Sequence, residues 1–284
     1  MPVALVTDSC HYLPPELVER CALHEVSLYV HSDGGARRER EIVDYDDYFS
    51  ALAAAAELPT TSQPSVGDFL AVYEPLLVAG DEIVSIHLSG GLSGTVGAAE
   101  QARAQLGADA ERVHVLDSET ACGAEGLMLL AAAAAIRGGA AARGAVARAL
   151  EARASLQFLF ALDTLEYLRR GGRIGGAQAW LGSALKIKPI LSLESEIGAV
   201  ERVRTSRRAF ERLVRLIEQM RADGCDGWVV QHTHVPEQAA ALVARGREIF
   251  GTEPVFVSEI GPVIGTHIGP GLLGVGGTRR ALLE

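Results

Sequence analysis

Short apolar runs alternate with helix-length segments through the first 160 residues, and this pattern most constrains the fold. VALVTDS (3–9), EIVSIHL (82–88) and RVHVLDS (112–118) each lead into a turn with Ser, Thr or Gly, and a helical pattern follows. Such alternation predicts strand–helix–strand units and a parallel, doubly wound sheet. Because ligands of these sheets bind beyond the carboxyl ends of the strands, we expect Ser9, Ser93 and Ser118 to lie along one rim.

Composition and charge exclude several classes of protein. The chain has 284 residues, 48% of them hydrophobic, and this length fits one large domain or two ordinary ones. Its net charge of −10 argues against nucleic-acid binding. The N-terminus has no basic leader, the longest alanine-rich stretch is too short to span a bilayer, and the four cysteines form no CxxC pair. These features predict a cytoplasmic protein with reduced thiols.

A second unit is predicted to begin near residue 158. We assign 1–157 to an N-terminal α/β domain and 158–284 to a second α/β domain. The first 160 residues hold 22 acidic and 10 basic side chains, whereas 161–284 hold 14 acidic and 16 basic ones. The local patterns predict one strand at HEVSLYVH (24–31), loops at SDGGARRER (32–40) and TTSQPS (60–65), and a polar turn at ESEIGAVE (194–201).

The turn SGGLSGT (89–95) is the first candidate for a ligand contact. It lacks the lysine of a nucleotide-binding P-loop, and Ser93 is one position away from the GxSxG spacing of a hydrolase nucleophile. Ser93 and Thr95 can cap the following helix, and the same exposed N–H groups can hold an anion. GPGLLG (269–274) matches GxGxxG, but no strand–helix–strand unit follows it, so we interpret it as a tight turn beside His267.

Other polar side chains allow two interpretations each. A lone histidine such as His267 is more often structural than catalytic, but its glycine-flanked position raises the odds of a functional role. His232 and His234 lack an evident third ligand, so no metal site is predicted. The arginines of YLRRGGRIGG (167–176) and ERVRTSRR (201–208) form either a solvated basic face or a site for carboxylate or phosphate groups.

Taken together, these stretches resemble the DegV family. The matching segments, in the family's order, are LVTDS, PTTSQPSVGDF, GLSGTVGAA, VLDSETACGAEGL, LDTLEYLRRGGRIGG, LGSALKIKPIL and HIGPGLLGV. They cover nearly the whole chain, and the combination of TSQPS, GLSGT and LEYLRRGGRI is specific. The sequence departs from the family pattern at Gly90, where members often have serine, and at Cys10, where serine or threonine usually follows TDS.

The resemblance implies a fatty-acid carrier with no cofactor or metal. Two α/β domains would hold an acyl chain in an apolar tunnel between them, and a partner kinase would phosphorylate the carboxylate with ATP. Carried over by position, the carboxylate-binding residues are Thr61, Ser62, Ser93, Gly94, Thr95 and His267. Arg170, Arg173 and Arg202 would lie toward the phosphoryl group or the partner. Transient contact with a membrane is also implied.

The physical chemistry of a fatty acid fits these residues. A carboxylate is costly to bury without hydrogen bonds, and hydroxyl and N–H donors can satisfy it without fixed positive charge. Each buried methylene contributes about 0.8 kcal/mol, so the tail can supply most of the affinity.

Two other functions remain open from the sequence. One is an acyl hydrolase with Ser93 as the nucleophile, His267 as the base and an aspartate such as Asp8 orienting the base. The other is a regulatory module that binds a partner through its arginines.

Overall fold

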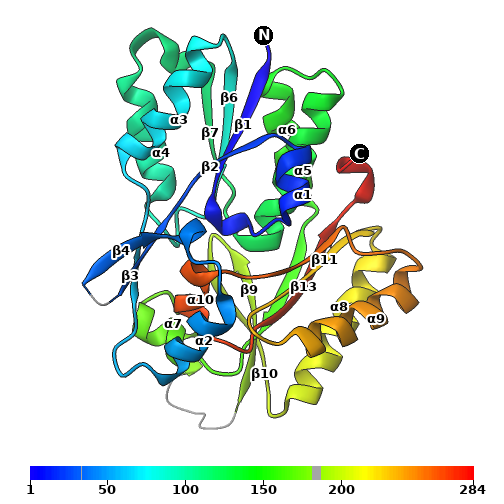
Figure 1. The fold of residues 1–284 in the computed structure, drawn as a ribbon. Helices are drawn as coiled ribbons and strands as arrows, with labels where there is room; N and C mark the ends of the chain where they lie inside the picture. The colour runs from blue at the N-terminus through cyan, green and yellow to red at the C-terminus, as the bar shows by residue number, and fades with distance from the viewer. Residues whose placement is uncertain (33, 181–186) are drawn as a thin grey trace.

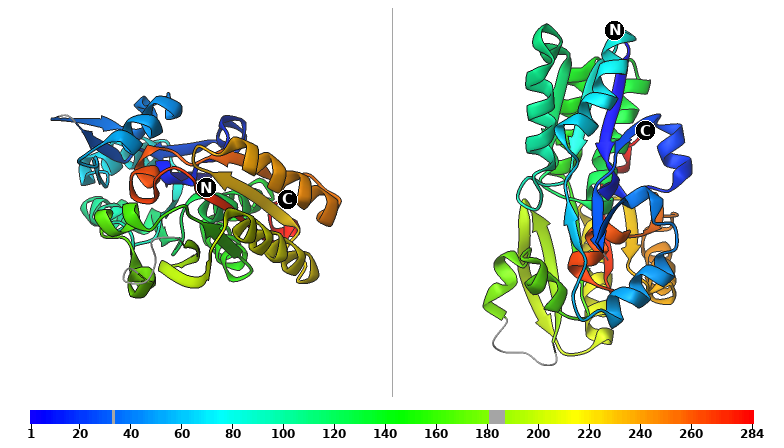
Figure 2. Two further views of the ribbon diagram at one scale, coloured as in Figure 1. Left: turned by 90° about the horizontal axis from the view of Figure 1, so that it is seen from below. Right: turned by 60° about the vertical axis from the view of Figure 1, so that its left-hand side comes forward.

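The computed structural model describes residues 1–32, 34–180 and 187–284, and it divides into two stacked lobes (Figures 1 and 2). The stretch LGSALKIKPIL begins at Leu181, so its first six residues, including Lys186, lie outside the described part of the chain. Among the described residues, no helix has the length and apolar character needed to cross a membrane. The four cysteines are free thiols.

The first lobe contains the predicted parallel sheet. Its strands are β1 (Val3–Asp8), β2 (Leu23–Val26), β6 (Glu82–His87) and β7 (Val113–Asp117), in the order β2-β1-β6-β7 with every neighbouring pair parallel. Helices α3 (Val66–Val78) and α4 (Thr95–Gln105) cover one face. Helices α1 (Pro15–Arg20), α5 (Cys122–Arg137) and α6 (Ala142–Ala154) pack on the other. The doubly wound arrangement predicted from the sequence is therefore confirmed.

The second lobe is built on a mixed six-stranded sheet in the order β10-β9-β8-β13-β11-β12. The strands are β8 (Gln157–Ala161), β9 (Lys188–Glu194), β10 (Glu196–Val203), β11 (Gly227–His232), β12 (Phe256–Glu259) and β13 (Leu273–Thr278). Within this described sheet, β11 and β12 pair in parallel and the other neighbours are antiparallel. Helices α8 (Ser206–Ala222) and α9 (Pro236–Phe250) cover one face, and α5 of the first lobe packs toward the other. The domain boundary at 157/158 stays a prediction.

Four local predictions were wrong, and the cause in each case is pairing that a short window cannot reveal. The segment 24–31 forms two strands, β2 and β3 (Tyr29–Ser32), which belong to different sheets. The two predicted loops contain β4 (Gly35–Arg38) and β5 (Thr60–Ser62), which pair with β3 in the order β4-β3-β5. The predicted turn at 194–201 is the tight β9–β10 hairpin, with Ser195 at φ 65°.

The segment that carries β3, β4, β5 and α2 (Tyr45–Ala54) packs against the second lobe. Helix α2 lies beside α10 (Pro262–Ile268), which itself contacts α7 (Glu166–Gly171) (Figure 1). The Tyr48 hydroxyl lies 2.6 Å from Thr266 Oγ1, and a Cβ on Gly265 would come within 2.7 Å of the Phe49 ring. Part of the N-terminal half thus closes over the C-terminal sheet.

Candidate functional site

A cavity of about 410 Å³ lies where the two lobes meet, and its walls are mostly apolar. The first lobe contributes residues that follow its strands, and the second contributes β8 and α10. The apolar wall consists of Leu28, Leu88, Leu92, Ala121, Cys122, Phe158, Phe160, Leu168, Leu193, Ile197, Ile260, Val263, Ile264, Ile268 and Leu272. Such a cavity suits a mostly apolar ligand, and its volume lies within the ~300–1,000 Å³ range common for small-molecule sites.

Polar groups from both halves of the chain also line this cavity. They are Thr61, Ser62, Gln63, Ser93, Gly94, Thr120, Arg173 and His267. Of the six residues predicted to bind the carboxylate, the structure brings five to the cavity wall. The sixth, Thr95, is buried at the start of α4, where its hydroxyl lies 2.8 Å from Ser93 Oγ and supports that side chain.

Thr61 and His267 are in direct contact. Thr61 Oγ1 lies 2.6 Å from His267 Nε2, while His267 Nδ1 is buried and has no partner among the described residues. Burial lowers the pKa of His267 to about 4, and the nearby Arg173 guanidinium contributes to the decrease. The imidazole is therefore neutral at physiological pH.

Ser93 is held by its own turn. Its N–H donates to the Ser89 carbonyl at 3.1 Å, and its Oγ accepts from the Thr95 N–H at 3.3 Å. At Gly94 a Cβ would overlap Gln63 Oε1, so the absence of a side chain here lets the Gln63 amide lie directly against the GLSGT turn. Two motifs that are separated in the chain by the whole of α3 and β6 are thereby fitted together at the polar part of the cavity.

The three predicted arginines lie in different environments. Arg173 lines the cavity, and its Nη1 donates to the Gly171 carbonyl at 2.7 Å. Arg170 instead donates to the Ala56 carbonyl at 2.8 Å, tying α7 to the segment after α2. The Arg202 guanidinium lies 5.5 Å from the centre of the Trp180 ring. Of the three, Arg173 is the one that the structure places on the cavity wall.

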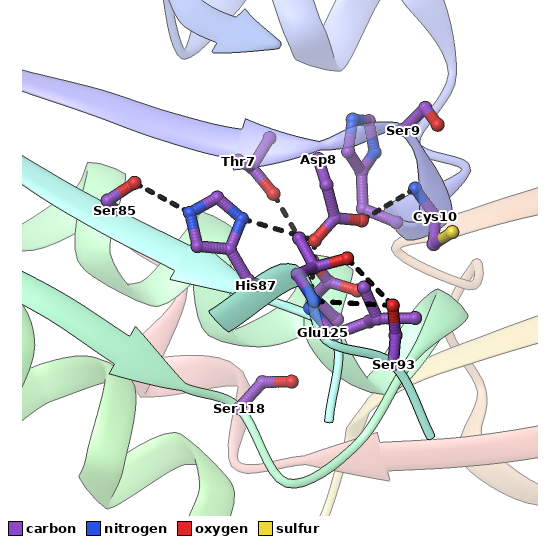
Figure 3. Close-up of polar contacts among 12 residues, drawn as sticks. Thr7, Asp8, Ser9, Cys10, Ser85, His87, Ser93, Ser118 and Glu125 are labelled. Carbon is purple, nitrogen blue, oxygen red and sulfur yellow. Dashed lines mark hydrogen bonds and ion pairs between the residues drawn. The ribbon is translucent and has the colours of Figure 1, made fainter. Parts of the chain in front are cut away.

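A series of hydrogen-bonded polar side chains is buried inside the first lobe, apart from the cavity (Figure 3). His87 Nδ1 lies 3.2 Å from Asp8 Oδ2, His87 Nε2 lies 2.7 Å from Ser85 Oγ, and Ser85 Oγ lies 2.7 Å from the Tyr73 hydroxyl. This connectivity resembles a catalytic triad, but all four side chains are fully buried. Asp8 therefore contacts His87 and not His267, so its predicted role in orienting His267 is wrong.

The three serines lie beyond the carboxyl ends of the parallel strands, as expected, but only one of them faces the cavity. Ser93 lines the cavity, but the hydroxyls of Ser9 and Ser118 are buried and used within the protein. Ser9 Oγ donates to Glu39, and Ser118 Oγ donates to the Thr120 carbonyl at 3.1 Å. Figure 3 shows these three serines around the ends of the parallel strands. Their placement followed from the topology, whereas the direction of each hydroxyl depended on local turns.

Several cavity residues were not predicted. Gln63 lies within the TSQPS motif, whose polar residues gave a usable signal. Phe158, Phe160 and Cys122 gave none, because scattered apolar residues look like ordinary core until the chain is folded. Among the described residues, no group of three or more His, Cys, Asp or Glu side chains gathers in a way that would hold a metal ion.

Comparisons with known proteins agree on one family. A family model described as an uncharacterised protein of the DegV family matches residues 2–279. A DegV domain-containing protein of Streptomyces coelicolor is 41% identical over 280 residues, covering 96% of this chain and 97% of the relative.

Two solved structures have the same fold and are described by what they bind. A DegV family protein from Thermus thermophilus, described for its fatty acid binding, has a TM-score of 0.89 and 35% identity, covering 98% of this chain and 100% of that one. DegV of Bacillus subtilis, described as a fatty acid binding protein, has a TM-score of 0.88 and 34% identity, with the same coverage.

Proposed function

The chain belongs to the DegV family, and from that premise we propose that it binds a long-chain fatty acid in the cavity between its lobes. The acyl chain lies against the apolar wall, and the carboxylate lies at Thr61 and Ser93. The observation that carries this proposal is the cavity itself, in which hydroxyl groups stand among apolar side chains. The fatty-acid binding described for two relatives at 34% and 35% identity supports it.

The balance of forces suits a carrier. Each buried methylene contributes about 0.8 kcal/mol of binding free energy, so a long tail supplies most of the affinity. The carboxylate needs hydrogen-bond donors when it leaves water, and hydroxyl groups provide them without a full positive charge. A head group held in this way stays exchangeable and chemically accessible.

The neutral imidazole of His267 determines how Thr61 can act. A hydroxyl has one proton, so Thr61 can donate to a carboxylate only if it accepts its hydrogen bond from His267. We therefore assign the proton of the imidazole to Nε2, which donates to Thr61 Oγ1 across 2.6 Å. This tautomer leaves Nδ1 as an acceptor, and Nδ1 is the buried atom that has no partner in the described part of the chain. His267 thus orients Thr61 and is not a general base.

We further propose that a separate kinase phosphorylates the bound fatty acid. A carboxylate oxygen attacks the γ-phosphorus of ATP held by the kinase, the bond to the β-phosphate oxygen breaks, and ADP leaves. Arg173, on the cavity wall, would balance the growing charge of the phosphoryl group. Arg170 and Arg202 would face the partner. A partner that uses ATP is consistent with the predicted cytoplasmic location, and loading from lipid would need transient membrane contact.

Extraction of the purified protein tests fatty-acid binding. We expect mass spectrometry of an organic extract to find co-purified fatty acid, and the delipidated protein to take up one equivalent of palmitate or oleate. An empty extract together with no saturable uptake of either acid contradicts the proposal. That result would favour the regulatory module, whose arginine face needs no lipid.

A further inference from the structure

Helix α10 carries His267, yet its first turn has no side-chain cap of its own. The helix begins at Pro262, which has no N–H, and it follows Gly261, which has no side chain. A Cβ on Gly261 would come within 2.7 Å of Tyr12 Cε1 and of the Tyr45 hydroxyl. No other residue fits at that position without displacing these rings. The free N–H groups of the first turn therefore need acceptors from elsewhere in the chain.

Glu39 and Tyr12 supply those acceptors from the N-terminal half. Glu39 lies in a short 3₁₀ turn (Glu39–Glu41), and its Oε1 accepts from the Val263 N–H at 2.8 Å. The Tyr12 hydroxyl accepts from the Ile264 N–H at 3.2 Å and donates to Glu39 Oε1 at 2.8 Å. The chain separation between Glu39 and Val263 is 224 positions, so this cap depends entirely on the tertiary fold.

The surroundings of Glu39 are arranged for a carboxylate. Its side chain is buried, with the residue only 1% exposed, and its other oxygen accepts from Ser9 Oγ. Ser9, Tyr12 and Val263 all donate to this carboxylate. Burial raises the pKa of Glu39 to about 7 in spite of these bonds and of the nearby Arg40.

The cap and the ligand site lie on one short helix. His267 follows Val263 by four positions, which is about one helical turn, and it meets Thr61 at 2.6 Å. Between these two contacts, the Tyr48 hydroxyl lies 2.6 Å from Thr266 Oγ1. Residues 39–61 therefore hold α10 at its start, near its end and at His267 itself.

We propose that Glu39 is a positioning residue of the fatty-acid site. Its carboxylate caps α10 from the N-terminal half of the chain, and the fixed helix presents His267 to Thr61 in the orientation that leaves the Thr61 proton free for the ligand. The proposal rests on the proposed function for the identity of the ligand. The position of His267 can be measured without any ligand.

The test uses Glu39→Gln, with Glu41→Gln as the matched control. The glutamine amide keeps one oxygen that can accept from the Val263 N–H, but its NH₂ group then faces other hydrogen-bond donors of this carboxylate. The control residue, Glu41, is an exposed carboxyl two positions away. The ring ¹⁵N shifts of His267 are measured in the delipidated proteins, and palmitate affinity is measured by titration. We expect Glu39→Gln to change the His267 shifts and to weaken palmitate binding about fivefold. Glu41→Gln should match the wild type.

A second variant keeps the test decisive if Glu39→Gln fails to fold. Tyr12→Phe removes a single hydroxyl of the same cap, and we expect it to move the His267 shifts in the same direction by a smaller amount. Unchanged His267 shifts and unchanged affinity in a folded variant overturn the role of Glu39 while fatty-acid binding stands. Failure of the wild type to bind palmitate overturns the proposed function, even if the His267 shifts respond as expected.

Discussion

Thr61 Oγ1 and His267 Nε2 lie 2.6 Å apart although 206 positions separate them in the chain. The contact joins β5 of the first half to α10 of the second at the polar part of an otherwise apolar cavity. It links the two halves where the ligand's head group is expected. Changes to this contact, or to the cavity around it, should therefore alter ligand binding in defined ways.

Removing either of the proposed carboxylate donors, Thr61 or Ser93, should weaken fatty-acid binding. Thr61→Val and Ser93→Ala each delete one hydroxyl while keeping most of the side-chain volume. A hydrogen bond to a charged group contributes about 1.5–3 kcal/mol, so we expect Kd to rise about tenfold or more. Isothermal titration with palmitate measures the change. Thr60→Val, at an exposed neighbour of Thr61, serves as the control, and unchanged affinity in both site variants would remove these residues from the site.

His267 should make unfolding pH-dependent in the acid range. Its folded-state pKa of about 4 is below the ordinary value of about 6.5, so the unfolded chain takes up the proton first as the pH falls. The stability associated with neutral His267 is present above about pH 6.5 and is lost between about pH 6.5 and 4. We expect the full loss to be about 3 kcal/mol.

Urea unfolding at pH 7 and pH 4.5 measures that loss. The free energy of unfolding should fall less in His267→Asn than in the wild type over this range. Parallel decreases in the two proteins would show that another group is responsible. Between pH 7 and 8, neither protein should respond through this residue.

Phe158 should limit the length of the bound acyl chain. Its ring lines the cavity and packs over Gly276 of β13, where a Cβ would overlap Phe158 Cδ2. Phe158→Ala enlarges the cavity, so a longer acid can bury one or two more methylenes. We expect the ratio of the affinities for longer and shorter acids to rise about tenfold. Competition between C14 and C18 acids measures this. Phe210→Ala, on the other face of the sheet, should leave the preference unchanged.

Gly94→Ala should disturb the site through a steric clash. The new methyl group would overlap Gln63 Oε1, so the Gln63 side chain must move away from the GLSGT turn. We expect weaker palmitate binding in Gly94→Ala and recovery in the double variant Gly94→Ala/Gln63→Ala. If the double variant binds no better than the single one, the contact between these loops does not set the site geometry.

Arg173 should affect phosphorylation more than binding. It lies on the cavity wall, but the head group is assigned to uncharged donors. With a partner kinase present, we expect Arg173→Ala to lower kcat about tenfold or more and to change palmitate Kd little. Arg169→Ala, at an arginine paired with Glu166 on the exposed face of α7, is the control. An equal effect on kcat and Kd would instead place Arg173 in ligand binding.

The sequence predicted those strands and helices whose apolar pattern is local and regular. Strand β1, strand β6 and the helices after them were evident from their apolar pattern, because each element follows from its own residues. Strands β4 and β5 were missed because their sequences are rich in Gly, Arg and Thr, and they form only by pairing with β3. The interruption between β2 and β3 at Ser27 and Leu28 was not predicted either, because it depends on which sheet each of the two strands joins.

The residues of the candidate site also include some that the sequence revealed and some that it did not. Thr61, Ser93 and His267 were found because they lie in motifs that resemble a known family, and the structure brings them to one cavity. Glu39 was missed because a glutamate in an arginine-rich loop looks solvated, whereas folding buries it under α10. The aromatic wall at Phe158 also depends on register, since it requires a glycine on the neighbouring strand.

The most direct test of the central claim is a crystal structure of the protein co-crystallised with stearate. We predict continuous elongated density between the lobes, with the carboxylate within hydrogen-bond distance of Thr61 Oγ1 and Ser93 Oγ and the tail running along Phe160 toward Phe158. Density for the acid elsewhere on the surface, with the cavity filled by side chains, would contradict it.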